Sequence, residues 1–218
     1  MATKRNIDSG KKDSMGRRIM ISGNSLAQDA NIDARKESIK NLDVNQKYSQ
    51  AINGDNHYAL AADSDYRIRS AVAEKSDNIH ILSELSYDYD WRVRRSVAGN
   101  SNAPTELVSD MVEDESNKVR NAALQNPRCD RYVLSDWSMK GDVPNRMAIA
   151  SNPSIDYNDL AALSADKDAD VRLSTVYNPS VSKGMLNELS QDEDQLVRSE
   201  AERVYWGKLK DEERRMKK

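Results

Sequence analysis

One stretch decides the fold of this chain, Asp88-Tyr-Asp-Trp-Arg-Val-Arg-Arg-Ser-Val-Ala-Gly-Asn100, because its pattern recurs. An acidic residue, the pair Val-Arg, small apolar residues and then Asn follow one another, and this kernel returns five more times. The kernel arginines are Arg69, Arg94, Arg120, Arg146, Arg172 and Arg198. They recur at a nearly constant interval of about 26 residues, which is typical of stacked structural repeats.

Each repeat reads as two short helical elements. We number positions from the kernel arginine, which is position zero. Position −4 is Asp or Ser, which are good N-cap residues, and positions −1 and +3 are mostly apolar. Asn at +6, followed in three repeats by Pro, predicts the end of this helix, with Asn in the left-handed conformation. A second apolar pair spaced by three follows, so a second short element is expected. Since a repeat of this length holds only two short helices, at least one is predicted to be a turn or two long, or of the 3₁₀ type.

The composition suits an elongated stack rather than one central core. The hydrophobic fraction is 38%, Phe is absent and 32% of the residues are charged. The ends are basic, with nine basic and five acidic residues in 1–40 and six against three in 208–218, whereas the segment between them carries 18 basic and 28 acidic residues.

The single cysteine, Cys129, excludes an internal disulfide framework and a site built from several thiolates. No apolar run approaches the length of a membrane-spanning helix, and the basic N-terminus lacks the apolar segment of a secretory signal. These features favour a cytoplasmic protein, or one assembled into a larger particle from the cytoplasm.

Four segments are predicted along the chain. Residues 1–24 form a basic flexible arm, and residues 25–63 form an N-terminal capping helix (over 32–42) and a degenerate repeat. Residues 64–199 form the repeat solenoid. Residues 200–218 form a C-terminal capping helix with a charged tail.

The repeat resembles the leucine-rich repeat variant family, a relative in style of HEAT-type α-solenoids. The cleanest copy runs from Asp168-Ala-Asp-Val-Arg172 through Asn178-Pro179 to Leu186 and Leu189, and the likeness covers about residues 63–200. The resemblance implies an all-α, right-handed superhelix of about six repeats, each an α-helix followed by a 3₁₀-helix. It brings no catalytic residues. The cysteine-rich iron–sulfur segment of some family members is absent here, so no cofactor is expected.

The kernel arginines allow two interpretations. A column of arginines could face phosphates. The favoured interpretation is structural, because an acid at −4 accompanies the arginine in nearly every repeat and suggests an ion-pair ladder between neighbouring repeats.

What varies between repeats is more informative about a partner. Aromatic residues at −3 and basic residues at −2 are confined to the first three repeats, where stacking would bring them into one strip. The predicted partner-binding residues are Tyr66, Arg67, Tyr89, Trp91, Arg92, Arg95 and Lys118. A second predicted binding set lies in the basic arm, at Lys4, Arg5, Lys11, Lys12, Arg17 and Arg18.

These patterns predict a non-enzymatic scaffold that binds a protein partner or another copy of itself, within a larger assembly. The alternative is a nucleic-acid binder that uses the strip and the arm, although the acidic body opposes phosphate. No membrane or small-molecule substrate is expected. His57 and His80 have no acidic or thiol partner at ligand spacing, so no metal site is predicted.

Overall fold

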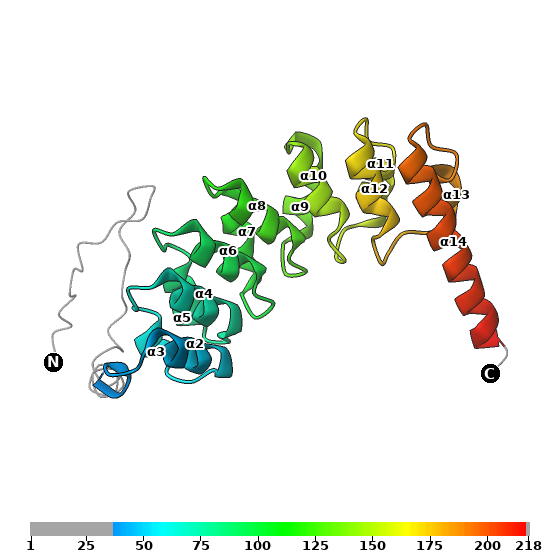
Figure 1. The fold of residues 1–218 in the computed structure, drawn as a ribbon. Coiled ribbons are helices and arrows are strands. Elements are labelled where there is room, and N and C mark those ends of the chain that lie inside the picture. The colour runs from blue at the N-terminus through cyan, green and yellow to red at the C-terminus, as the bar shows by residue number, and fades with distance from the viewer. Residues whose placement is uncertain (1–36, 217–218) are drawn as a thin grey trace, which may run out of the picture. The chain divides into compact units, whose positions relative to one another are not determined.

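The computed structural model describes residues 37–216, and within this range the chain is helical without a strand (Figure 1). The prediction of an all-α repeat fold is confirmed. The helices form two compact parts that divide after Ala103. The first part contains α2 (Val44–Asn53), α3 (His57–Leu60), α4 (Tyr66–Lys75), α5 (Ile79–Leu85) and α6 (Trp91–Gly99).

The second part continues the alternation of a kernel helix and a second helix. It contains α7 (Thr105–Asp110), the 3₁₀ turn η1 (Met111–Glu113), α8 (Asn117–Gln125), α9 (Arg131–Lys140), α10 (Val143–Ala150), α11 (Tyr157–Ser164), α12 (Ala169–Val176), α13 (Lys183–Leu189) and α14 (Gln195–Met216). The kernel helix of the last repeat and the predicted capping helix are thus one continuous helix, α14.

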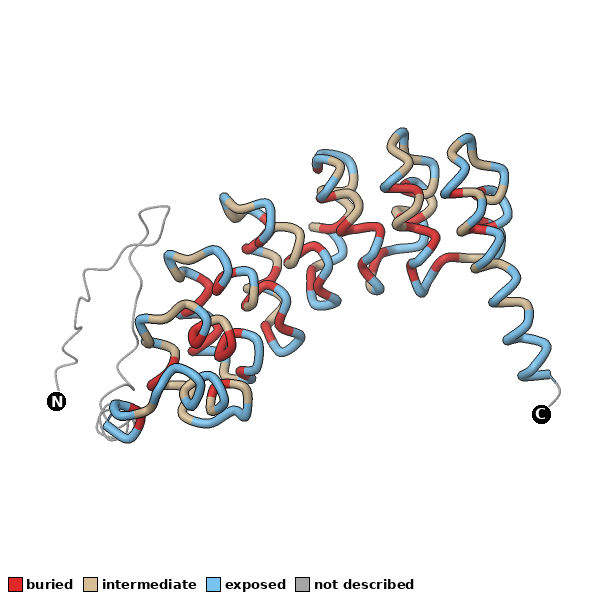
Figure 2. Tube along the Cα trace, viewed as in Figure 1, coloured by how far each residue is buried: buried red, intermediate tan, exposed pale blue. Residues whose placement is uncertain are grey.

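The kernel helices begin where the sequence predicts, because their N-cap aspartates accept backbone N–H groups. Asp65 accepts from Arg67, Asp90 from Arg92 and Asp142 from Asn145. Kernel helices pack on kernel helices, α4 against α2 and α6 in the first part and α8, α10, α12 and α14 in series in the second. Apolar residues at −1 and +3 are fully buried between them, and Figure 2 shows these buried segments along the helices.

The second element of the repeat differs from the expectation in one detail. It is an α-helix in α5, α9, α11 and α13, and a 3₁₀ turn occurs within the described residues only after α7. A helix of six to ten residues fits because the connections are only a few residues long.

The left-handed conformation expected for the asparagines at +6 was wrong, although the helices do end just before them. Asn100 and Asn126 end their helices with φ of −74° and −69°, and the single non-glycine residue with positive φ in the described range is Asn56. Their side chains explain why asparagine recurs at +6, as described below.

The N-terminal end contains a shortened repeat. α2 has a capping box between Asp43 and Gln46, ends at Gly54 (φ 85°) and packs against α4. Of the helix expected over 32–42, residues 37–39 are helical and a turn follows at 40–41, while the part before residue 37 lies outside the described residues.

Candidate functional site

The kernel arginines form ion pairs between neighbouring repeats. Arg69 donates from Nε and Nη2 to the two carboxylate oxygens of Asp88 at 2.6 and 2.9 Å, and both side chains are almost fully buried. Arg146 pairs in the same way with Asp166. Two N–H···O bonds join the guanidinium group to the carboxylate in each pair, so the pair fixes the relative orientation of the two side chains as well as their separation. It therefore aligns one repeat on the next.

The acid in these pairs is not the acid at −4 that the sequence pattern suggested. The acid at −4 caps its own helix, and the partner of the arginine is the acid at −6 of the following repeat, as Asp192 is for Arg172. Asp192 also accepts the backbone N–H of Asp194, and its carbonyl accepts from Arg198. Asp88 and Asp166 make the same contacts, so each of these −6 aspartates connects two kernel arginines.

The degenerate N-terminal repeat has the same connection with a different residue. Lys47 lies four positions after the cap Asp43, which is the kernel position, and its Nζ lies 2.9 Å from a carboxylate oxygen of Asp63. Lys47 lies nearly one repeat before Arg69, a spacing that is visible in the sequence. The pattern of kernel arginines does not include it, because the residue is lysine.

The ladder changes at the repeat that begins with α10. Position −6 is Lys140 there, and Arg120 instead donates to the carbonyls of Asp114 and Glu115 and to the Asn117 side chain.

In the same repeat, position −1 is Asn145, which is buried where the other five regular repeats have Val or Ile. Its amide donates to the side-chain oxygens of Asn121 (2.6 Å) and Asn117 (3.3 Å), while Asn117 donates to Asp142.

A second ladder is made by the asparagines at +6. Asn152 donates to the carbonyls of Leu124 (2.7 Å) and Asn126 (2.9 Å), and Asn178 repeats this contact with Ala150 and Asn152. These carbonyls lie at the C-terminal end of the preceding kernel helix, where no intrahelical donor remains. The asparagine amide thus caps the neighbouring helix, which explains why a polar residue is buried at a fixed place in the repeat.

Several residues of the predicted partner-binding strip lie close together in the first part of the molecule, on α4 and α6. The Arg92 guanidinium carbon lies 4.4 Å from the centre of the Tyr66 ring and 5.4 Å from that of Trp91, so this arginine stacks on both aromatic side chains. Arg69 lies 4.6 Å from the Tyr89 ring, whose side chain is 80% exposed. The four residues Tyr66, Tyr89, Trp91 and Arg92, together with Arg67, are called the strip below.

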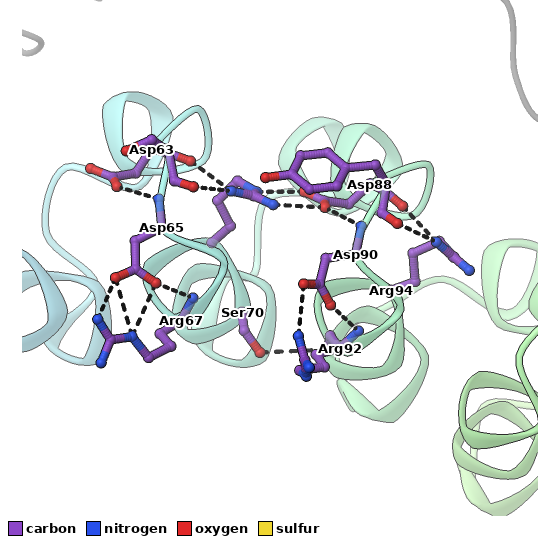
Figure 3. Close-up of polar contacts among 11 residues, drawn as sticks. Asp63, Asp65, Arg67, Ser70, Asp88, Asp90, Arg92 and Arg94 are labelled. Atoms are coloured by element: carbon purple, nitrogen blue, oxygen red, sulfur yellow. Dashed lines mark hydrogen bonds and ion pairs between the residues drawn. The ribbon is translucent and has the colours of Figure 1, made fainter.

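Both arginines of the strip carry their own counter-ion. Figure 3 shows Arg67 against Asp65 and Arg92 against Asp90, with contacts of 2.6 and 3.0 Å. The Arg67 hydrogen bonds lower the pKa of Asp65 to about 2. A shallow groove of about 640 Å³ lies along these residues, lined by Ser64, Asp65, Tyr66, Arg67, Tyr89 and Asp90. The strip is therefore aromatic and nearly neutral rather than strongly cationic.

The other predicted binding residues do not all join the strip. Arg95 is an exposed residue on α6, one turn after Arg92. Lys118 is exposed on α8, in the second part of the molecule. The six basic residues predicted in the arm, Lys4 to Arg18, lie outside the described residues.

The two histidines lie on different helices, α3 and α5. His57 contacts the Ala51 carbonyl through Nε2 at 2.8 Å, and His80 is exposed on α5. Within residues 37–216 no three His, Cys, Asp or Glu side chains are grouped so as to hold a metal ion. In the same range no helix is long and apolar enough to cross a bilayer.

Comparison with solved structures supports the repeat geometry. One solved structure, described as "a leucine-rich repeat variant with a novel repetitive protein structural motif", matches with a TM-score of 0.54 and 24% sequence identity. The match covers 79% of this chain and 71% of that chain. This chain has the leucine-rich repeat variant fold.

The leucine-rich repeat variant fold is what this likeness establishes, and it assigns no activity. No family model and no curated protein sequence matches the chain. The resemblance read from the repeat pattern and the structural match therefore agree on the fold. The features that vary between repeats remain the guide to function.

Proposed function

We propose that this protein is a non-catalytic repeat scaffold that binds another protein through the strip on α4 and α6. Repeat folds of this kind present extended surfaces, and a scaffold role is their common use. Membership of a larger assembly and a cytoplasmic location belong to the same proposal.

The observation that carries the proposal is the exposure of Tyr89 beside Trp91 and the stacked Arg92. Tyr, Trp and Arg are the residues that dominate the energetics of protein interfaces. Here they stand on packed helices or directly before them, so little conformational entropy is lost when a partner binds. The other repeats have different residues at these positions, so the repeating pattern does not account for them.

The paired arginines favour protein over nucleic acid. A phosphate that binds Arg67 or Arg92 must compete with the carboxylates of Asp65 and Asp90, which lie 2.6 and 3.0 Å away. A protein surface with apolar groups and a few acceptors requires no such exchange. Nucleic-acid binding remains the alternative outcome of the test.

The test is affinity purification from the native host, with and without nuclease. Wild-type protein is expected to retain a protein partner after nuclease treatment, and Tyr89→Ala is expected to lose it. Tyr132→Ala is the matched control, because Tyr132 is an 87% exposed tyrosine on α9. Loss of every partner on nuclease treatment would instead support the nucleic-acid alternative.

A further inference from the structure

Position −2, which holds Arg67 and Arg92 of the strip, carries different residues in the second part of the molecule. Positions −2 and +1 lie on one side of each kernel helix because they are three positions apart. In α6 they are Arg92 and Arg95, whereas in α12 they are Asp170 and Leu173. Across α10, α12 and α14 the residues at these positions, called the C-terminal face below, are Pro144, Met147, Asp170, Leu173, Leu196 and Ser199.

The C-terminal face is mainly apolar and partly exposed. Leu196 is 55% exposed, Pro144 is exposed, and Met147 and Leu173 are half-buried. The kernel helices that carry them pack side by side, α10 against α12 and α12 against α14. An exposed apolar surface that is shared by three neighbouring helices is typical of an interaction site.

The cap aspartates of this face lack the arginines that accompany the strip. Asp168 accepts the backbone N–H of Asp170, and Asp194 accepts those of Leu196 and Val197. Within residues 37–216 no basic side chain forms an ion pair with either carboxylate. Residues 156–200 as a whole contain ten acidic and four basic side chains. The C-terminal face is thus apolar with an acidic edge.

We propose that the C-terminal face of one copy of this chain binds the strip of a second copy. This inference rests on the proposed function and names the partner. The strip offers aromatic rings to the aliphatic side chains of Leu196 and Leu173. Beside the strip, the exposed Arg95 on α6 offers its guanidinium group to Asp170 and to the cap carboxylates, so the two surfaces match in polarity and, at Arg95, in charge.

The contact is heterologous, since strip and face are different surfaces. A copy that has bound through its strip still has its own face available, and association can continue beyond two copies unless the arrangement closes. The expected behaviour is therefore concentration-dependent association to multiples of the 24.6 kDa chain. Added salt weakens it, because the charges involved are exposed.

The repeat pattern supplies a variant that removes the face without removing the fold. Asp170→Arg with Leu196→Arg places arginine at −2 beside Asp168 and Asp194, which copies the native pairing of Arg67 with Asp65. The strip surface and the neighbouring Arg95 are altered separately by Tyr89→Ala with Arg95→Glu, both at exposed positions. Tyr132→Ala again serves as the control, and melting temperatures verify that all variants fold.

The experiment is sedimentation velocity of the full chain from about 1 µM to about 1 mM, a range that covers weak specific dissociation constants. The wild type and Tyr132→Ala are expected to associate, and each double variant is expected to raise the dissociation constant at least about tenfold. An equimolar mixture of the two double variants is expected to form a complex of two chains, because one supplies an intact strip and the other an intact face.

Three results would overturn the inference. They are a wild type that stays monomeric throughout the range, association unaffected by either double variant, and a mixture that does not associate. Failure here leaves the proposed function separately testable, because retention of a different protein partner after nuclease treatment depends on Tyr89 alone and not on Leu196.

Discussion

Arg172 and Asp192 belong to successive repeats and are joined by two hydrogen bonds, from Nε at 2.7 Å and from Nη2 at 2.8 Å. The two side chains are 8% and 7% exposed. Arg172 lowers the pKa of Asp192 by these hydrogen bonds, against the effect of burial. The pair joins the repeat of α12 to the repeat of α14, and equivalent pairs recur along the chain.

Arg172→Ala is predicted to destabilise the protein strongly. It leaves the Asp192 carboxylate buried without its cation, and such a loss costs about 3–5 kcal/mol. Arg120→Ala should cost less, because the hydrogen bonds of Arg120 are to two carbonyls and an amide rather than to a carboxylate. Arg131→Ala, at an exposed position on α9, is the control. Urea unfolding of the three variants measures the order, and equal losses for Arg172 and Arg120 would contradict it.

Asn152→Ala is predicted to weaken the stack through the second ladder. The change leaves the carbonyls of Leu124 and Asn126 without their donor, and a buried unsatisfied group costs about 1–3 kcal/mol. Asn158→Ala, at an exposed position on α11, should change the free energy of unfolding by less than about 0.5 kcal/mol. If both variants unfold at the same urea concentration, the asparagine ladder contributes nothing.

Asn145→Val is predicted to be neutral or stabilising. The substitution restores the apolar residue found at −1 in the other regular repeats, and it removes polar atoms from a buried site. The partners left behind, Asn117 and Asn121, are exposed enough to bond to water. Thermal melting checks this, and a loss of more than about 2 kcal/mol would mean that the amide cluster holds the α8–α10 contact together.

Acid is predicted to destabilise the fold between about pH 4 and about pH 2. The pKa of Asp65 is about 2 in the folded chain and about 3.9 when unfolded, so the unfolded state binds more protons in this window and stability falls as pH falls. The lowered pKa of Asp192 acts in the same direction. Urea midpoints measured from pH 5 to pH 2.5 should fall less steeply for Asp65→Asn than for the wild type. Parallel curves would disprove the contribution of Asp65.

The sequence predicts the fold because the repeat makes its signals visible several times, the N-cap position in six repeats and Asn at +6 in four. The N-caps and the buried apolar positions lie where the pattern indicates, and the helices end just before Asn at +6. The partners of the kernel arginines were not predictable in this way, because Asp88 and Asp90, at −6 and −4 of the next repeat, are both acidic. Only the packing between repeats selects Asp88 as the partner of Arg69. The same limit concealed the asparagine ladder, whose acceptors lie a whole repeat earlier in the chain.

The strip could be predicted in part. The aromatic residues at −3 indicated the right helices, and the structure adds that Arg92 stacks on Tyr66 from the neighbouring repeat. The pairing of Arg67 and Arg92 with their own cap aspartates was missed, although the close spacing of each pair is visible in the sequence. This pairing favours the proposed protein partner over the nucleic-acid alternative.

The central claim is that the repeating residues hold the stack while the strip binds a partner. Its most direct test is to measure the melting temperature and partner retention on the same samples of Tyr89→Ala and Arg172→Ala. Tyr89→Ala is predicted to melt within about 2 °C of the wild type and to lose the partner. Arg172→Ala is predicted to melt well below the wild type and to retain the partner at temperatures where it is folded. Full retention of the partner by Tyr89→Ala would contradict the claim.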